Sequence, residues 1–313
     1  MRGIFPLALL VLIIALLPLL EPWTEVVLTL ALAKGFAVLG IIVLLQAGQV
    51  SFGHAMFMAA SAYCVAFLAN RSGVLEISLL LPAALLCSAL MGLLVGLFVV
   101  RYRYIFFGML NLAFSMVLYS VLEKFFYITG GSDGMRVPRP LLLGQELERA
   151  DYERWLFYLT LTLAVLLSWL VWRYLRSPLG QALAALKTNE TRLEYLGVSA
   201  RRVLLIAYII SALLAGLGGT LLALAQGLVT PEYGYWVRSG ELVFIAILGG
   251  AGHVAGAFIG ALVYEVVRLY AAAYAADIWQ LILGSFLLLI ILFAPQGLVG
   301  MAQHWLRRRG SPP

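Results

Sequence analysis

The sequence predicts an all-α membrane protein, a polytopic bundle of about ten transmembrane helices. Of its 313 residues, 63% are hydrophobic and only 12% are charged, and the mean hydropathy is +1.00. A soluble domain carries about 25% charged residues, so this chain has too few charges to cover a surface that faces water. The apolar residues also fall into long runs, and most charges lie between the runs. These observations predict a single transmembrane domain over residues 1–313.

Ten apolar runs are candidate spans, because a helix needs about 20 apolar residues, with a range of about 17–25, to cross the hydrocarbon core. The runs are 4–20, 26–46, 50–69, 78–100, 105–123, 155–175, 203–226, 241–251, 254–275 and 279–298. The first follows Arg2 and has no small-x-small cleavage site after it, so we expect an uncleaved helix and not a signal peptide. The eighth is too short to span and runs into Gly249-Gly250-Ala251-Gly252, which predicts a broken or re-entrant helix near 241–251.

The charges between the runs predict the orientation of the chain. With the N-terminus in the cytoplasm and ten alternating crossings, the cytoplasmic pieces hold twelve cations and two acids. The outer pieces hold seven cations and twelve acids, Glu241 among them. Cationic loops stay in the cytoplasm during insertion. We therefore expect both termini, the loop 176–202 and the tail 299–313 to be cytoplasmic, and the loop 124–154 to be periplasmic.

Five spans precede the predicted outer loop and five follow it. A repeat with an odd number of spans must be inverted in the membrane, so the count permits an inverted five-plus-five repeat, a design found in many transporters. The net charge of +6 follows from this topology, and we do not interpret it as a surface that binds nucleic acid.

Three charged residues lie inside predicted spans. Glu265 and Arg268 are three residues apart and share a helix face, so we interpret them as a pair that neutralises itself. Lys34 lies near the middle of the second span without an evident partner, and we expect it to snorkel to the interface or to face a wet cavity. Cys64 and Cys87 lie in apolar runs without metal-ligand spacing, which is typical of packing residues.

The predicted cytoplasmic loop carries clear helix signals. Ser177-Pro178 is typical of a helix start, and an apolar stripe at helical spacing follows it. Asn189 predicts the cap of a second short helix, 190–196. Gly197 suits the left-handed residue that ends a helix, and Ser199 predicts the cap of the next span. Helix chemistry alone leaves two interpretations open, a loop lying on lipid headgroups and a projecting pair of helices.

Polar side chains gather where the third span begins, because Gln46, Gln49, Ser51 and His54 lie there beside two glycines. Small residues let helices approach closely, and amides and hydroxyls form hydrogen bonds between them. Helix-to-helix contact is therefore one interpretation, and a translocation path is the other. The glycines of 249–260 leave the same two interpretations, close packing or contact with a solute.

Six blocks of the chain, in the same order, resemble the M-type permease subunits of branched-chain amino acid ABC transporters. The blocks are GQVSFGHAMF at 48–57, NLAFS at 111–115, TGGSDG at 129–134, SPLGQALAALKTNETRLEYLG at 177–197, LGGAGHVAG at 248–256 and FAPQGL at 293–298. The resemblance extends from about residue 35 to residue 300. One departure concerns the Glu-Ala-Ala that importers place six residues before the loop glycine, since Thr191 stands there and Glu190 lies one place earlier.

The resemblance implies a multi-pass protein of the bacterial inner membrane, embedded in the lipid bilayer with partner subunits. These are a second homologous permease, two cytoplasmic ATPases and a periplasmic solute-binding protein. The ATPases would bind ATP, so no cofactor is expected on this chain, which has no GxxxxGK[ST] phosphate loop. Residues 189–197 would be the coupling helix that docks on an ATPase. Its candidate contacts are Glu190, Arg192, Glu194, Tyr195, Leu196 and Gly197.

The resemblance also implies candidate sites elsewhere. Candidate translocation-path residues are Gln46, Gln49, Ser51, His54, Asn111 and Ser115. Candidate contacts for the binding protein are Gly130, Gly131 and Asp133. Substrates in the family extend from branched-chain amino acids to urea, amides and aromatic acids, and the binding protein largely sets that choice.

Two other classes of function compete with this interpretation. A secondary transporter driven by protons or sodium usually needs acidic residues near the membrane midplane, and Glu265 is the only carboxylate clearly within a predicted span. A membrane-embedded enzyme needs paired Asp, GxSxG or His–metal spacing, and none of the predicted spans has such a pattern. We therefore expect a transport protein and not an enzyme.

Overall fold

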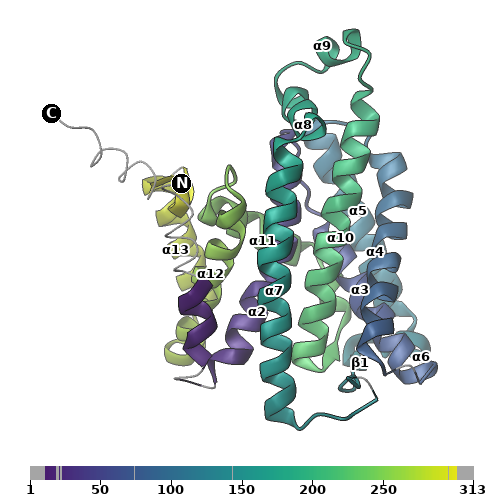
Figure 1. Cartoon of the computed structure of the whole chain (residues 1–313), viewed down its shortest axis with the longest axis vertical. Helices are drawn as coiled ribbons and strands as arrows, with labels where there is room; N and C mark the ends of the chain where they lie inside the picture. Colours follow the sequence, from purple (N-terminus) through teal and green to yellow (C-terminus); the bar gives the residue numbers. More distant parts are fainter. Residues whose placement is uncertain are drawn as a thin grey trace, which may run out of the picture.

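The computed structural model describes residues 11–18, 21, 23–73, 75–142, 144–294 and 296–301. Most of these residues are helical, and Figure 1 shows the long helices packed side by side. The long helices are α2 (Thr24–Gln46), α3 (His54–Arg71), α4 (Ile77–Val99), α5 (Tyr104–Lys124), α7 (Arg149–Arg176), α10 (Ala200–Gln226), α11 (Trp236–Gly249), α12 (Val254–Tyr274) and α13 (Trp279–Phe293). The short elements are α6 (Phe126–Thr129), η1 (Gly131–Asp133), α8 (Pro178–Thr188), α9 (Glu190–Tyr195) and η2 (Pro231–Gly234).

The predicted spans coincide with helices of the structure, which confirms the all-α polytopic fold. Of the first run, residues 11–18 are helical; its other residues and the tail beyond residue 301 lie outside the described residues. Six helices are long and apolar enough to cross a membrane: α2, α4, α5, α7, α10 and α12. The eighth predicted span is α11, with 14 residues. A helix of that length is about 21 Å long, shorter than the hydrocarbon core.

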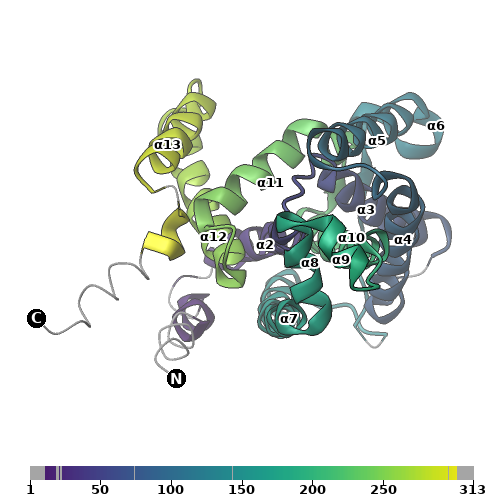
Figure 2. The same ribbon diagram turned by 90° about the horizontal axis from the view of Figure 1, so that it is seen from above.

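The centre of the bundle is formed by α2 and α10. In their most apolar stretches, 83% of α2 and 72% of α10 is buried, against 28% to 33% for α4, α5 and α7. The two central helices approach closely at small residues. A Cβ added to Gly218 would lie 2.4 Å from the carbonyl oxygen of Ala33, and one on Gly40 would lie 2.6 Å from that of Ser211. In Figure 2, α13 lies at one end of the molecule and α5 and α6 lie at the other.

Non-helical backbone enters the bundle at two places. Residues 47–53 connect α2 to α3, and residues 227–235 connect α10 to α11 through the strand β2 (Leu228–Val229) and the single 3-10 turn η2. The first segment extends from Gly48, beside α8, to His54, which contacts Ser211 near the middle of α10. Such backbone is tolerated at membrane depth only where protein buries it. The helices that follow, α3 and α11, correspond to the third and eighth predicted spans, so they hold the same place in the two groups of five.

The strand pairing was not predicted from the sequence. β1 (Met135–Arg136) pairs antiparallel with β2 (Leu228–Val229), which joins the 124–154 loop to the end of α10. Figure 1 shows β1 and α6 at the end of the molecule opposite α8 and α9. The two predicted loops therefore lie at opposite ends of the bundle.

The glycine-rich turn between α11 and α12 brings two backbones together. A Cβ on Gly256 would lie 2.6 Å from the carbonyl oxygen of Gly250, and one on Gly260 would lie 2.5 Å from that of Ile245. Gly250 itself has φ +108°, which L-residues rarely adopt. Of the two interpretations left open for these glycines, close packing fits the structure.

Candidate functional site

The N-terminal ends of α3 and α11 meet inside the bundle. α3 begins at His54, and Ser239 lies in the first turn of α11. The N–H of Ala55 is one of the four that a helix start leaves without a helical partner, and it donates to Ser239 Oγ at 2.9 Å. Two helix ends that carry positive partial charge therefore lie together in the interior. We call this meeting point the α3–α11 junction.

His54 is held at the α3–α11 junction by α10. Its Nε2 lies 2.5 Å from Ser211 Oγ, and Ser211 donates to the carbonyl oxygen of Gly40 at 2.7 Å. A hydroxyl has one hydrogen to donate, so His54 Nε2 is the donor to Ser211. His54 Nδ1 is then an acceptor, and it is buried with no hydrogen-bond partner among the residues that the structure describes. Buried polar atoms are rarely left unpaired, which marks this position as a candidate contact for a solute.

Two residues of α5 complete the α3–α11 junction. Asn111 accepts a hydrogen bond from the hydroxyl of Tyr208, and its own Nδ2 donates to the carbonyl oxygen of Phe107 at 2.8 Å. Ser115 Oγ donates to the carbonyl oxygen of Gly234 at 2.8 Å, which joins α5 to η2. Asn111, Ser115 and Tyr208 are fully buried.

The structure brings four of the six predicted path residues to this region and places the other two elsewhere. Ser51 lies just before α3 and accepts from a backbone N–H at 3.3 Å. Gln46 instead donates to the carbonyl oxygen of Ala251, in the α11–α12 turn, at 3.2 Å. Gln49 accepts from the N–H of Tyr104, at the start of α5, at 2.8 Å. Gln46 therefore joins the end of α2 to the α11–α12 turn, and Gln49 joins the segment 47–53 to the start of α5.

The chemistry of the α3–α11 junction suits binding. The N-terminal ends of helices attract anionic groups such as carboxylates, and the acceptor Nδ1 of His54 suits an N–H donor. In the part of the chain that the structure describes, no group of three or more His, Cys, Asp or Glu side chains is placed to hold a metal. The junction therefore offers complementary groups to a small zwitterion.

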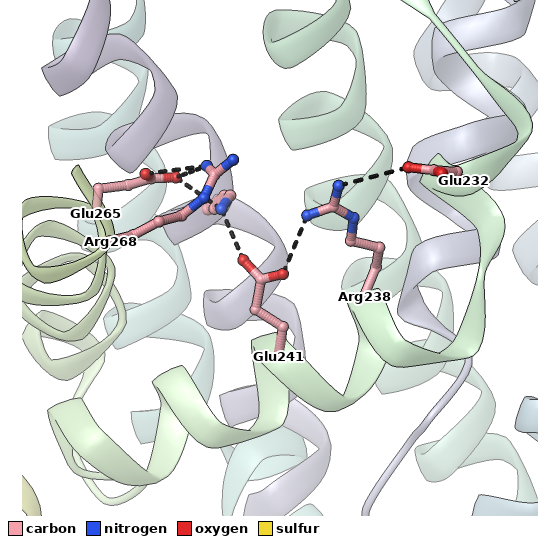
Figure 3. Close-up of polar contacts among 6 residues, drawn as sticks. Glu232, Arg238, Glu241, Glu265 and Arg268 are labelled. Atoms are coloured by element: carbon pink, nitrogen blue, oxygen red, sulfur yellow. Dashed lines mark hydrogen bonds and ion pairs between the residues drawn. The ribbon is translucent and has the colours of Figure 1, made fainter. Parts of the chain in front are cut away.

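A second polar group lies between α2, α11 and α12 (Figure 3). Lys34 Nζ lies 2.7 Å from Glu241 Oε1 and 2.6 Å from Glu265 Oε1. Each carboxylate also pairs with an arginine of its own helix, Glu241 with Arg238 and Glu265 with Arg268, both at 3.3 Å. We call these residues, with Glu232 at the outer edge, the ion cluster. Its three positive and three negative charges balance.

The ion cluster corrects two sequence-based predictions and adds a partner to a third. Lys34 was expected to snorkel or to face a wet cavity, and this is wrong, because Lys34 is buried between two carboxylates. Glu241 was counted among the outer charges, but it is largely buried in α11. Glu265 and Arg268 do form a pair, although Lys34 shares the carboxylate. A charge in the membrane interior requires such partners.

The α8–α9 loop confirms the predicted helix signals. Ser177 Oγ accepts from a backbone N–H at 3.3 Å at the start of α8, and Asn189 Oδ1 accepts from the N–H of Arg192 at 2.9 Å at the start of α9. Gly197 has φ +80°, the left-handed conformation that ends the helix. Ser199 accepts from the backbone of α10 at 3.5 Å. Figure 1 shows α9 at the extreme end of the molecule.

The surface of α9 combines exposed apolar groups with one internal ion pair. Tyr195 is 87% exposed and Leu196 75% exposed, whereas Leu193 is buried against the body of the protein. Glu190 does not face solvent freely, because Arg103 donates to its two oxygens from Nε and Nη2 at 2.8 and 2.7 Å. The other exposed candidates on this loop are Arg192, Glu194 and Gly197.

At the opposite end of the molecule, two of the three predicted docking residues shape the backbone. Gly130 and Gly131 have φ +77° and +52°. A Cβ on Gly130 would lie 2.1 Å from the carbonyl oxygen of Gly134, and one on Gly131 would lie 2.5 Å from the ring of Phe126. Asp133 is exposed in η1.

Sequence reasoning missed the residues that complete these sites. Tyr208 and Ser211 are polar residues inside an apolar span, a signal that could have marked them as contacts between helices. Ser239 and Arg103 lie near helix starts and carry no motif of their own.

Comparison with known proteins gives a consistent family. The model of the family described as the permease component of branched-chain amino acid transport systems matches residues 24–292. The high-affinity branched-chain amino acid transport system permease protein LivM of Escherichia coli is 32% identical over 332 aligned residues, covering 99% of this chain and 78% of that protein. LivM of Salmonella typhimurium is 32% identical over 285 residues, covering 84% of this chain and 67% of its own length. BraD of Pseudomonas aeruginosa is 30% identical over 127 residues, 40% of this chain and 41% of BraD. No solved structure matches the chain significantly.

Proposed function

The chain belongs to the family of permease components of branched-chain amino acid transport systems, and on that premise we propose that it is a membrane subunit of an ATP-driven importer for branched-chain amino acids. In this proposal it pairs with a second, related permease in the bacterial inner membrane. Two cytoplasmic ATPases drive transport, and a periplasmic binding protein delivers the solute. The chain itself forms part of the translocation path.

The proposal depends mainly on the α8–α9 loop, which exposes apolar side chains at one end of the bundle. It is a compact element that joins α7 to α10, and its exposed Tyr195 and Leu196 are apolar anchors of the kind that dominate protein contacts. A short helix fixed to two long ones can pass rigid-body movement from a docked ATPase into the membrane. Arg192 and Glu194 supply charged contacts at the rim, and Gly197 sets the turn.

Within the chain, we place the solute path at the α3–α11 junction. A solute carboxylate would lie at the two helix ends, and its ammonium group would donate to His54 Nδ1. Opening the path would separate Ala55 from Ser239, which are joined by a single hydrogen bond. The alternative, that these polar residues only hold helices together, predicts that Ser239→Ala lowers the melting temperature and leaves the KM for uptake unchanged.

Reconstitution in liposomes tests the proposed energy source. The purified chain alone should not hydrolyse ATP, and uptake of radiolabelled leucine should require the ATPases and the binding protein. The gradient-driven alternative gains two observations, since Glu241 and Glu25 are largely buried carboxylates besides Glu265. All three are paired, because Lys34 binds Glu241 and Glu265, and Arg154 binds Glu25. Uphill uptake by this chain alone, driven by a proton or sodium gradient, would overturn the proposal.

Competition tests the substrate. Isoleucine and valine should compete with labelled leucine for uptake, and urea, short amides and aromatic acids should not. If only urea or an amide competed, the proposal of an ATP-driven importer would stand, and the proposed substrate would be wrong.

Labelling tests the orientation. In a variant without Cys64 and Cys87, a cysteine at Gly144 should react with an impermeant reagent in intact cells, and one at Ser199 should react only after lysis. Labelling of Ser199→Cys from outside would overturn the cytoplasmic placement of the α8–α9 loop.

A further inference from the structure

The connection between α4 and α5 holds a residue in a disfavoured conformation. Tyr104, the first residue of α5, has φ +52°, and among the described residues it is the one non-glycine residue with a positive φ. Bulky L-residues avoid this region, so surrounding contacts must hold Tyr104 there. Strained backbone of this kind is typical of elements that switch between two arrangements.

The first of these contacts comes from the α8–α9 loop. Arg103, the preceding residue, binds both carboxylate oxygens of Glu190 in α9. Its remaining nitrogen, Nη1, donates to the carbonyl oxygens of Val100 and Tyr102 at 2.5 and 2.9 Å. The guanidinium therefore bridges α9 and the end of α4. A planar fork that binds two oxygens fixes orientation as well as distance.

The second contact comes from the non-helical segment 47–53. The N–H of Tyr104 donates to Gln49 Oε1 at 2.8 Å. One turn further along α5, an added Cβ on Gly108 would lie 3.1 Å from the backbone of the same segment. The next turn carries Asn111, which belongs to the α3–α11 junction. The start of α5 thus touches the loop on one side and the backbone that leads into α3 on the other.

We propose that Arg103 is a positioning residue that transmits movement of α9 to α5 and to segment 47–53. The inference rests on the proposed docking of α9 on an ATPase. When α9 moves, the paired guanidinium carries the start of α5 with it, Tyr104 leaves its left-handed conformation, and Gln49 moves with the Tyr104 N–H. The helix that carries Asn111 and Ser115 then shifts together with the segment that carries Ser51 and leads into α3. Coupling between distant sites needs an element with two arrangements, and the Tyr104 connection supplies it.

The test uses the assembled transporter, with its ATPases and binding protein, in liposomes. Two quantities are measured, ATP hydrolysis and uptake of radiolabelled leucine, and their ratio is compared. Arg103→Gln should leave assembly and hydrolysis in place and lower the leucine transported per ATP about tenfold, within the usual range of coupling between sites. Arg103→Lys keeps the positive charge but not the planar guanidinium, so it should lower the leucine transported per ATP less than Arg103→Gln does. The matched control is Arg101→Gln, an exposed cation of the same connection, which should leave the ratio unchanged.

A charge exchange keeps the test decisive if a single variant fails to assemble. Arg103→Glu combined with Glu190→Arg should recover part of the ratio that either single change loses, because it restores the ion pair with α9 and not the hydrogen bonds to the carbonyl oxygens of Val100 and Tyr102. A wild-type ratio in Arg103→Gln would overturn the inference, as would an assembled exchange variant that stays as uncoupled as the single ones. Leu196→Asp separates this result from the docking proposal. If Leu196→Asp transports normally, the docking proposal is overturned. If Leu196→Asp loses transport while Arg103→Gln keeps the wild-type ratio of leucine to ATP, only the transmission through Arg103 is overturned.

Discussion

The ion cluster and the Arg103–Glu190 pair use the same kinds of side chain in contrasting surroundings. The side chains of Lys34 and Glu265 are 8% and 6% exposed, and the cluster joins α2, α11 and α12. The side chains of Arg103 and Glu190 are 18% and 34% exposed, and they join one loop helix to one helix connection. Charges attract more strongly in a low-dielectric interior, and an unpaired charge is tolerated far less there than beside water.

This difference separates two tasks. The buried cluster cannot be broken without leaving a charge unpaired in the membrane, so it fixes α11, and with it Ser239, relative to α2. The pair at the loop can exchange its partner for water at a smaller cost, which leaves it free to differ between states. We therefore expect variants of the cluster to act on stability and variants of the loop to act on coupling.

The largest expected effect is that of Lys34→Met, which leaves Glu241 and Glu265 without their shared cation. Removing one partner of a buried pair typically costs about 3–5 kcal/mol. We expect little of the variant to accumulate in membranes, and a clearly lower melting temperature for the fraction that does. Lys124→Met, at the exposed end of α5, is the control and should match the wild type. If Lys34→Met melted at the wild-type temperature, the comparison would fail, because the ion cluster would then not stabilise the folded protein.

Leu196→Asp should act on coupling alone. Truncating or charging an apolar anchor typically costs about 2 kcal/mol or more of binding free energy, roughly a thirtyfold weaker contact. The variant should insert and melt like the wild type, and lose solute-stimulated ATP hydrolysis and uptake. Gln181→Asp places the same charge on the exposed face of α8 and should transport normally. If Leu196→Asp transports like the wild type, α9 is an ordinary surface helix.

Gly197→Val tests the backbone of the same loop. A Cβ at this position would meet nothing within 4 Å, so only the φ of +80° opposes the substitution. A β-branched residue in the left-handed region costs about 1–2 kcal/mol, which should displace the end of α9 and reduce stimulated ATP hydrolysis. Gly197→Asn, which tolerates that region, should retain most of the activity. Equal activity of the two variants would show that the turn has no part in docking.

The smallest effect is expected at the outer edge of the ion cluster. Glu232 lies 4.0 Å from Arg238, and its side chain is 74% exposed. Exposed pairs contribute about 0–1 kcal/mol, so Glu232→Gln should melt within a few degrees of the wild type and transport normally. Glu241→Gln, at the buried end, should melt at a clearly lower temperature. If Glu232→Gln lowered the melting temperature as much as Glu241→Gln, the contribution of each ion pair to stability would not depend on its burial.

Local features explain how much of the site was predictable. The caps Ser177 and Asn189 and the left-handed Gly197 act within a few residues of themselves, so their roles could be inferred from neighbouring sequence. The exposure of Tyr195 and Leu196 and the burial of Leu193 could not, because they depend on how the loop packs on the body. Glu190 departs from the expected docking pattern in the sequence. In the structure its carboxylate forms an ion pair with Arg103 of the same chain.

The sequence by itself determined the fold class, the approximate limits of the long helices that the structure describes, and the family. These follow from the length of apolar runs and from short motifs, which are properties of neighbouring residues. Only the tertiary structure decided which distant groups meet. Lys34 and Glu241 are 207 residues apart, and His54 and Ser211 are 157 apart. No spacing rule relates such positions, because the packing of α2, α10, α11 and α12 brings them together. A buried charge or polar group then becomes stable only where that packing supplies its partner.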